Sequence, residues 1–137
     1  MSFRLSNTSL SRLEGVHPDL VTVVKRAIEI TPLDFGVSEG VRSAERQKTL
    51  FESGASKTMK SRHLTGHAVD LVAYFEGEVS WHIGHYQRIH EEAMDVAANA
   101  LGINIVWGGD WDDDGDYTDQ TFIDGPHWQL PWRDYPA

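Results

Sequence analysis

Cysteine is absent from this 137-residue sequence, proline is scarce, and no apolar run approaches the length of a membrane span. Without cysteine, disulfides, thiolate metal ligands and thiol redox chemistry are excluded. A membrane-spanning helix needs about 20 consecutive apolar residues, so we expect no membrane insertion. The first 20 residues alternate between polar and apolar and lack the apolar core of a signal peptide. We therefore expect synthesis in the cytoplasm without a signal peptide.

Positive charge is also scarce. The chain carries 12 Lys and Arg against 21 Asp and Glu, a formal net charge of −9. This charge repels phosphate backbones and anionic lipid surfaces, so we expect no nucleic-acid partner. A chain of this length, 40% hydrophobic, suits one folded domain, and we expect a monomer.

The spacing of apolar residues predicts a mixture of helices and short strands. Helical spacing runs from Pro18 to Ile30 and from Ile83 to Leu101, and Ser43 can cap a further helix that ends at Gly54. Short apolar or β-branched segments predict strands at 35–41, 67–74, 103–107 and 127–130. Helices followed by strands interleaved with a helix and a long loop favour an α+β domain over a doubly wound parallel sheet.

The segment SRHLTGHAVDL, residues 61–71, places one carboxylate, Asp70, inside an apolar strand. Burying an unpaired carboxylate is costly, so Asp70 requires a cationic partner, hydrogen-bond donors or a metal ion. A salt-bridged core aspartate is one interpretation. A metal ligand is the other, because Gly66 permits the loop to fold back and bring His63 to the same point.

A second histidine, His127, follows Asp124 closely in the segment DGPH near the C-terminus. Two histidines and one carboxylate leave the fourth tetrahedral position of Zn²⁺ open for water. His63, Asp70 and His127 are therefore candidate ligands of a catalytic zinc. Asp124 is then a candidate general base that takes a proton from the activated water.

Two other residues allow competing interpretations. His67 lies four residues after His63, but Leu64 stands where a helical zinc motif requires glutamate, so we favour a solvent-facing or supporting role for His67. Arg42 follows an expected strand and precedes an expected helix. From this place its guanidinium can hold a carboxylate or carbonyl bidentately, although an ordinary surface ion pair fits equally well.

The motif SRHLTGHAVD (61–70) resembles the SxHxxGxAxD signature of the zinc D-Ala-D-Ala carboxypeptidase (VanY-like) family, and DGPH (124–127) resembles its second motif. Within that family the chain is most similar to phage endolysins that are L-alanyl-D-glutamate peptidases. The resemblance implies the Hedgehog/DD-peptidase fold, a small antiparallel sheet with flanking helices. It also implies one catalytic Zn²⁺ and a bacterial peptidoglycan substrate, cut at the L-alanyl-D-glutamate bond of the stem peptide during phage lysis. The enzyme would reach the wall in the periplasm after the membrane is permeabilised, as a single catalytic domain, 1–137, without a cell-wall-binding domain.

The same resemblance implies residue roles. The zinc ligands would be His63, Asp70 and His127, and the general base would be Asp124. Arg42 would stabilise the polarised substrate carbonyl, and Ser61 would position the substrate. Gln129 departs from the family, which commonly has a glutamate-type residue there, and the base is therefore assigned to Asp124. Two alternatives stay open: a D-Ala-D-Ala carboxypeptidase or dipeptidase with the same metal site, and a metal-stabilised binding module without turnover.

An acidic insertion precedes the last motif. Asp110, Asp112, Asp114 and Asp116 have the alternate spacing of the first half of a calcium loop. The second half does not match, because Thr121 stands where such a loop places its bidentate glutamate. The insertion predicts weak Ca²⁺ binding or none, and a solvated acidic loop is an equal alternative.

Overall fold

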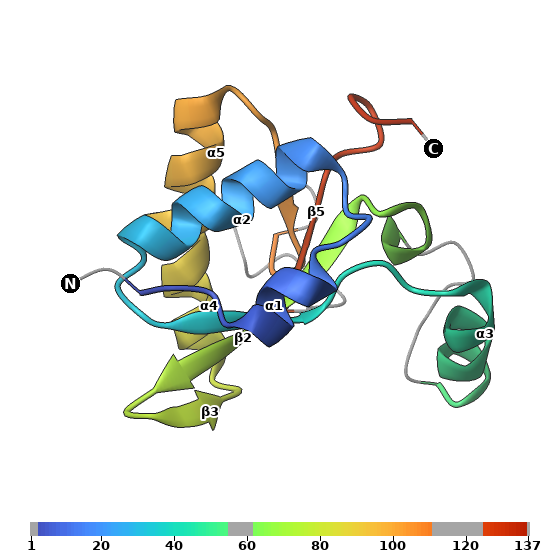
Figure 1. Cartoon of the computed structure of the whole chain (residues 1–137), viewed down its shortest axis with the longest axis horizontal. Coiled ribbons are helices and arrows are strands. Elements are labelled where there is room, and N and C mark those ends of the chain that lie inside the picture. Colours follow the sequence, from blue (N-terminus) through green and yellow to red (C-terminus); the bar gives the residue numbers. More distant parts are fainter. Residues whose placement is uncertain (1–2, 55–61, 111–124, 137) are drawn as a thin grey trace.

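A computed structural model describes residues 3–54, 62–110 and 125–136, and Figure 1 shows how their helices and strands are arranged. The helical elements are α1 (Asn7–Arg12), α2 (Pro18–Ile30), α3 (Ala44–Glu52), the 3₁₀ turn η1 (Arg62–Thr65), α4 (Ile83–Ile89), the π turn η2 (His90–Met94) and α5 (Asp95–Leu101). The strands are β1 (Phe35–Glu39), β2 (Ala68–Phe75), β3 (Glu78–Ser80), β4 (Val106–Trp107) and β5 (His127–Gln129). The expected α+β class is confirmed.

The strands form one antiparallel sheet with the order β1-β2-β5-β4, and β3 pairs with β2 as a hairpin. The register places His127 of β5 directly opposite Asp70 of β2. On the other side of β2, Glu39 of β1 also lies opposite Asp70, after a register shift between Val37 and Glu39. Strand pairing alone therefore brings two charged or titratable side chains from distant parts of the chain to Asp70.

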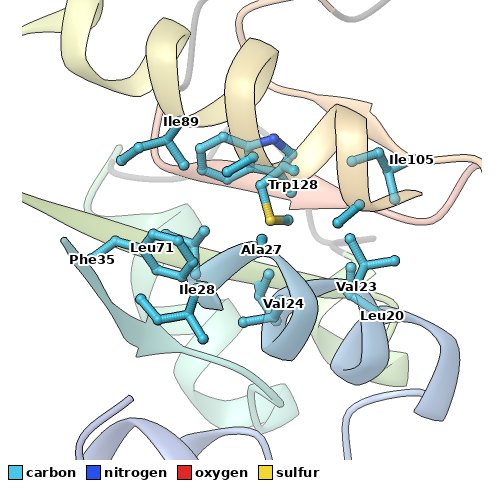
Figure 2. Close-up of a cluster of buried hydrophobic side chains, with 14 of the residues drawn as sticks. Leu20, Val23, Val24, Ala27, Ile28, Phe35, Leu71, Ile89, Ile105 and Trp128 are labelled. Atoms are coloured by element: carbon cyan, nitrogen blue, oxygen red, sulfur yellow. The ribbon is translucent and has the colours of Figure 1, made fainter. Parts of the chain in front are cut away.

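The core lies between this sheet and helices α2, α4 and α5. Apolar residues of α2 recur at the spacing of one helix face and are buried: Leu20, Val23, Val24, Ala27 and Ile28. Figure 2 shows them facing Phe35 and Leu71 of the sheet, Ile89 of α4, Ile105 and Trp128. Full burial of each large apolar side chain contributes about 1.5–3 kcal/mol. This packing fixes β2 and β5, the two strands that carry Asp70 and His127.

The sequence predictions hold for the best-defined elements and fail in detail elsewhere. The helix from Pro18 to Ile30 is confirmed, and Ser43 caps α3 by accepting a hydrogen bond from the Arg46 amide. The expected helix over 83–101 is not uniform, because the π turn η2 separates α4 from α5. Within η2, His90 is buried and its Nδ1 accepts a hydrogen bond from Trp128 Nε1 at 3.1 Å.

Strand boundaries also differ from expectation. The strands expected at 35–41, 103–107 and 127–130 are shorter, and the strand expected at 67–74 is shifted by one residue to Ala68–Phe75. Helix α1 and strand β3 were not predicted. Among the described residues, no helix combines the length and the apolar character that a membrane crossing requires.

Candidate metal centre

Side chains from three elements meet at one point of the structure. His63 comes from η1, Asp70 from β2 and His127 from β5. The Asp70 Oδ1 atom lies 3.1 Å from His63 Nε2 and 3.1 Å from His127 Nδ1. One ligand atom from each residue lies within 4.8 Å of the others, so a single ion can contact all three. The structure thus brings together the three residues that the sequence singled out as candidate zinc ligands.

The hydrogen bond on the far side of the His63 ring favours metal binding. His63 Nδ1 lies 2.8 Å from the carbonyl oxygen of Gly40. A carbonyl only accepts, so Nδ1 donates to it, and the neutral ring then has its lone pair on Nε2, which faces Asp70. Position 40 requires glycine, because a Cβ there would collide with the Arg12 carbonyl oxygen. In this neutral form a lone pair and a carboxylate oxygen face the same point, and a divalent ion between them fits this donor set.

The charge state of Asp70 suits the same conclusion. Burial acts to raise the pKa of Asp70, but hydrogen bonds from the rings of His127 and His63, with the charge those rings carry when protonated, together outweigh it and hold the pKa below its usual value. Asp70 is therefore ionised at neutral pH, the state in which a carboxylate binds a metal. The alternative, a salt-bridged aspartate, has a partner in Arg42, whose Nη2 lies 3.8 Å from Asp70 Oδ2. That separation is an ion pair without a direct hydrogen bond.

Arg42 lies beside the three residues and is fixed from two sides. Its Nε and Nη2 donate to Glu39 Oε1 and Oε2 at 2.7 and 2.9 Å, and its Nη1 donates to Gln47 Oε1 at 2.6 Å. Only 9% of the side chain is exposed, so Arg42 is not in an ordinary surface ion pair. Its hydrogen bonds lower the pKa of Glu39, which keeps that carboxylate ionised. Because Gln47 lies on α3, this hydrogen bond also connects α3 to Arg42; Figure 1 shows α3 set apart from the other helices.

Three residues that shape this site were not predicted from the sequence. Glu39 is three residues from Arg42, a spacing typical of a local ion pair, and this signal could have revealed it. Gln47 lies on a polar helix, and no pattern there indicates its complete burial. Arg62 precedes His63, and its Nη2 donates to the carbonyl oxygens of Leu130 and Tyr135 at 3.0 and 2.7 Å. Arg62 thereby ties η1, which carries His63, to the segment after β5.

Other predicted site residues have different outcomes. His67 is not among the converging residues; its Nδ1 lies 2.6 Å from Thr65 Oγ1 and its ring lies next to His17. Ser61, Asp124, Asp112, Asp114 and Asp116 lie outside the described residues. Asp110 is described and is 2% exposed. The calcium loop therefore stays a prediction.

A family model for phage L-alanyl-D-glutamate peptidases matches residues 1–131 of the chain. The chain belongs to this family. It is 33% identical over 136 residues to the L-alanyl-D-glutamate peptidase of Escherichia phage T5, covering 95% of this chain and 99% of the relative. It is 34% identical over 99 residues to that of Listeria phage A118, covering 72% of this chain but only 31% of the relative.

A solved structure in the same class is also similar. The crystal structure of the L-Ala D-Glu endopeptidase ChiX from Serratia marcescens matches with a TM-score of 0.86 and 46% sequence identity. The match covers 98% of this chain and 95% of that chain. The resemblance to L-alanyl-D-glutamate peptidases that the motifs indicated is thus confirmed at the level of the family.

Proposed function

We propose that this family member is a zinc-dependent peptidase that cleaves the L-alanyl-D-glutamate bond of peptidoglycan stem peptides. The observation that carries the proposal is the convergence of His63 Nε2, Asp70 Oδ1 and His127 Nδ1 on one point. Family membership and the names of the relatives support the choice of bond. The placement of one ligand on the turn η1 and of two on strands β2 and β5 of a small antiparallel sheet supports assignment to the Hedgehog/DD-peptidase fold.

The three ligands would hold the metal, and the remaining residues would handle charge and protons. A zinc ion in this place supplies Lewis-acid chemistry, which polarises an amide carbonyl and makes water a stronger acid. Asp124 accepts the proton of the attacking water and passes it to the leaving amine of D-glutamate. Arg42, held beside Asp70 by Glu39, stabilises the negative charge that develops on the carbonyl oxygen. Ser61 positions the substrate.

The biological setting follows from the same proposal. Phage peptidases of this class act on the host cell wall, so we place this protein in lysis. It is made in the host cytoplasm and reaches peptidoglycan in the periplasm once the membrane is permeabilised. Its catalytic domain occupies residues 1–137.

A digest of purified muropeptides with zinc-loaded protein tests the reaction. Mass spectrometry should show L-alanine left on the muramic acid and a released peptide that begins with D-glutamate. Release of terminal D-alanine alone would instead identify a D-Ala-D-Ala carboxypeptidase or dipeptidase. Intact muropeptides despite bound zinc would identify a binding module without turnover.

Two variants separate the proposed roles in this assay. Asp124→Ala should retain bound zinc and lose most turnover, because the proton acceptor is removed and the three ligands are not. His63→Ala should lose zinc itself, because one of three protein ligands is gone. Full turnover in Asp124→Ala would place the base elsewhere.

A further inference from the structure

Gln129 contacts the ring of His127 on the side away from Asp70. The amide oxygen Oε1 of Gln129 lies 2.8 Å from His127 Nε2. The two residues are two apart on β5, so their side chains leave the same face of the strand. Gln129 pairs with Ala68 of β2 and with Val106 of β4, so neighbouring strands hold its backbone on both sides. The contact is therefore built into the centre of the sheet.

This contact favours one tautomer of the neutral His127 ring. An amide oxygen only accepts, so Nε2 donates to it, and the neutral ring then has its lone pair on Nδ1. Nδ1 is the atom that lies 3.1 Å from Asp70 Oδ1. If Nε2 were left without an acceptor, the proton could reside on Nδ1 and block the ligand position.

The same arrangement occurs on the opposite side of the site. His63 uses its near nitrogen, Nε2, toward Asp70, and its far nitrogen, Nδ1, toward the Gly40 carbonyl. His127 uses Nδ1 toward Asp70 and Nε2 toward Gln129. One imidazole is thus oriented by a main-chain oxygen and the other by a side-chain oxygen. Only the second can be removed by substitution without disturbing the backbone.

We propose that Gln129 is a positioning residue of the metal centre, which holds His127 in the orientation and tautomer that present Nδ1 to a divalent cation. The proposal rests on the proposed function only in that it requires the ion to bind His127; it does not depend on which bond is cleaved. Hydrogen-bond partners of metal-ligating histidines typically contribute about 10–100-fold to metal affinity. As a neutral acceptor, Gln129 does so without adding a second negative charge beside Asp70.

The test compares two substitutions at this position with a matched control. Gln129→Met removes the acceptor and keeps a similar length, whereas Gln129→Glu keeps an acceptor. Gln87→Met makes the same change on α4, where Gln87 donates to Glu91 in an exposed contact. Zinc affinity of the metal-free proteins is measured by competition with a chromophoric chelator. Gln129→Met should bind zinc about 10–100-fold more weakly, whereas Gln129→Glu and Gln87→Met should stay within a few-fold of the parent.

A second readout reports on His127 directly. Long-range ¹H–¹⁵N correlations of the metal-free protein, recorded at a pH where the His127 ring is neutral, should show proton occupancy on Nε2 in the parent and a shift toward mixed tautomers in Gln129→Met. Parent-like zinc affinity in Gln129→Met would overturn the proposal, and so would an equal loss in Gln129→Glu, which would indicate packing. Failure of the parent itself to bind zinc would contradict the proposed zinc peptidase, and the tautomer measurement would still test the role of Gln129.

Discussion

Replacement of Gly66 by alanine tests how the loop between His63 and Asp70 is held. Gly66 has a φ of +77°, its amide donates to the His63 carbonyl at 3.4 Å, and its carbonyl accepts from the His17 amide at 2.8 Å. A Cβ at this position would lie 2.5 Å from the carbonyl oxygen of Gly15. That contact is with backbone, so one of the two segments must shift.

The cost has two parts. The left-handed conformation costs an alanine about 1–2 kcal/mol, and displacing packed structure adds about 1–3 kcal/mol. Gly66→Ala should therefore lower the free energy of unfolding by about 2–5 kcal/mol. Gly77 and Gly102 provide matched controls, since their φ values are +80° and +71° and a Cβ would meet no atom within 4 Å. Alanine at position 77 or 102 should lower the free energy of unfolding only by the cost of the left-handed backbone conformation, about 1–2 kcal/mol.

Denaturant unfolding of the metal-free proteins measures the difference, with chelator present so that zinc does not contribute. For a domain of this size, each kcal/mol lost corresponds to a fall in melting temperature of about 3–6 °C. If Gly66→Ala were no less stable than Gly77→Ala and Gly102→Ala, the Gly15 carbonyl would not confine the loop between His63 and Asp70, contrary to this prediction.

Three further predictions concern the metal, the arginine and a buried histidine. Zinc at 100 times its dissociation constant should stabilise the parent by about 2.7 kcal/mol, and calorimetric melting should show no such gain in Asp70→Ala. Glu39→Gln should lower kcat/KM for muropeptides about tenfold or more, because Arg42 loses a charge-assisted hydrogen-bond partner. The zinc affinity of this variant should stay near that of the parent, because the three metal ligands are unchanged. Unchanged kinetics would show that Glu39 has no role in the site. Burial lowers the pKa of His90 in the folded protein from the ordinary 6.5, so the unfolded chain binds more protons there and stability should fall as the pH drops below about 6.5. His90→Asn, which keeps an acceptor for Trp128, should show a shallower loss in pH-dependent unfolding, and an identical slope would assign the loss to other groups.

Much of the candidate site could be predicted from the sequence because its ligands lie in short, distinctive segments. An aspartate in an apolar strand requires a partner, and Gly66 marks a turn that its positive φ confirms. The register that places Asp70 opposite His127 could not be predicted, because strand pairing across 57 residues depends on tertiary packing.

Other features left weaker signals in the sequence. The π turn at His90–Met94 changes the helical spacing of apolar residues so little that the sequence predicts one continuous helix there. Helix α1 and strand β3 are too short for a periodic pattern. Gln47 is completely buried and accepts a hydrogen bond from Arg42, and the polar composition of α3 gives no sign of this burial.

Anomalous diffraction at the zinc edge from crystals grown with zinc tests the central claim most directly. We predict one strong peak within about 2.0–2.2 Å of His63 Nε2, an Asp70 carboxylate oxygen and His127 Nδ1. A peak bound elsewhere, or none at these three residues in metal-replete crystals, would contradict the metal centre and the peptidase mechanism built on it.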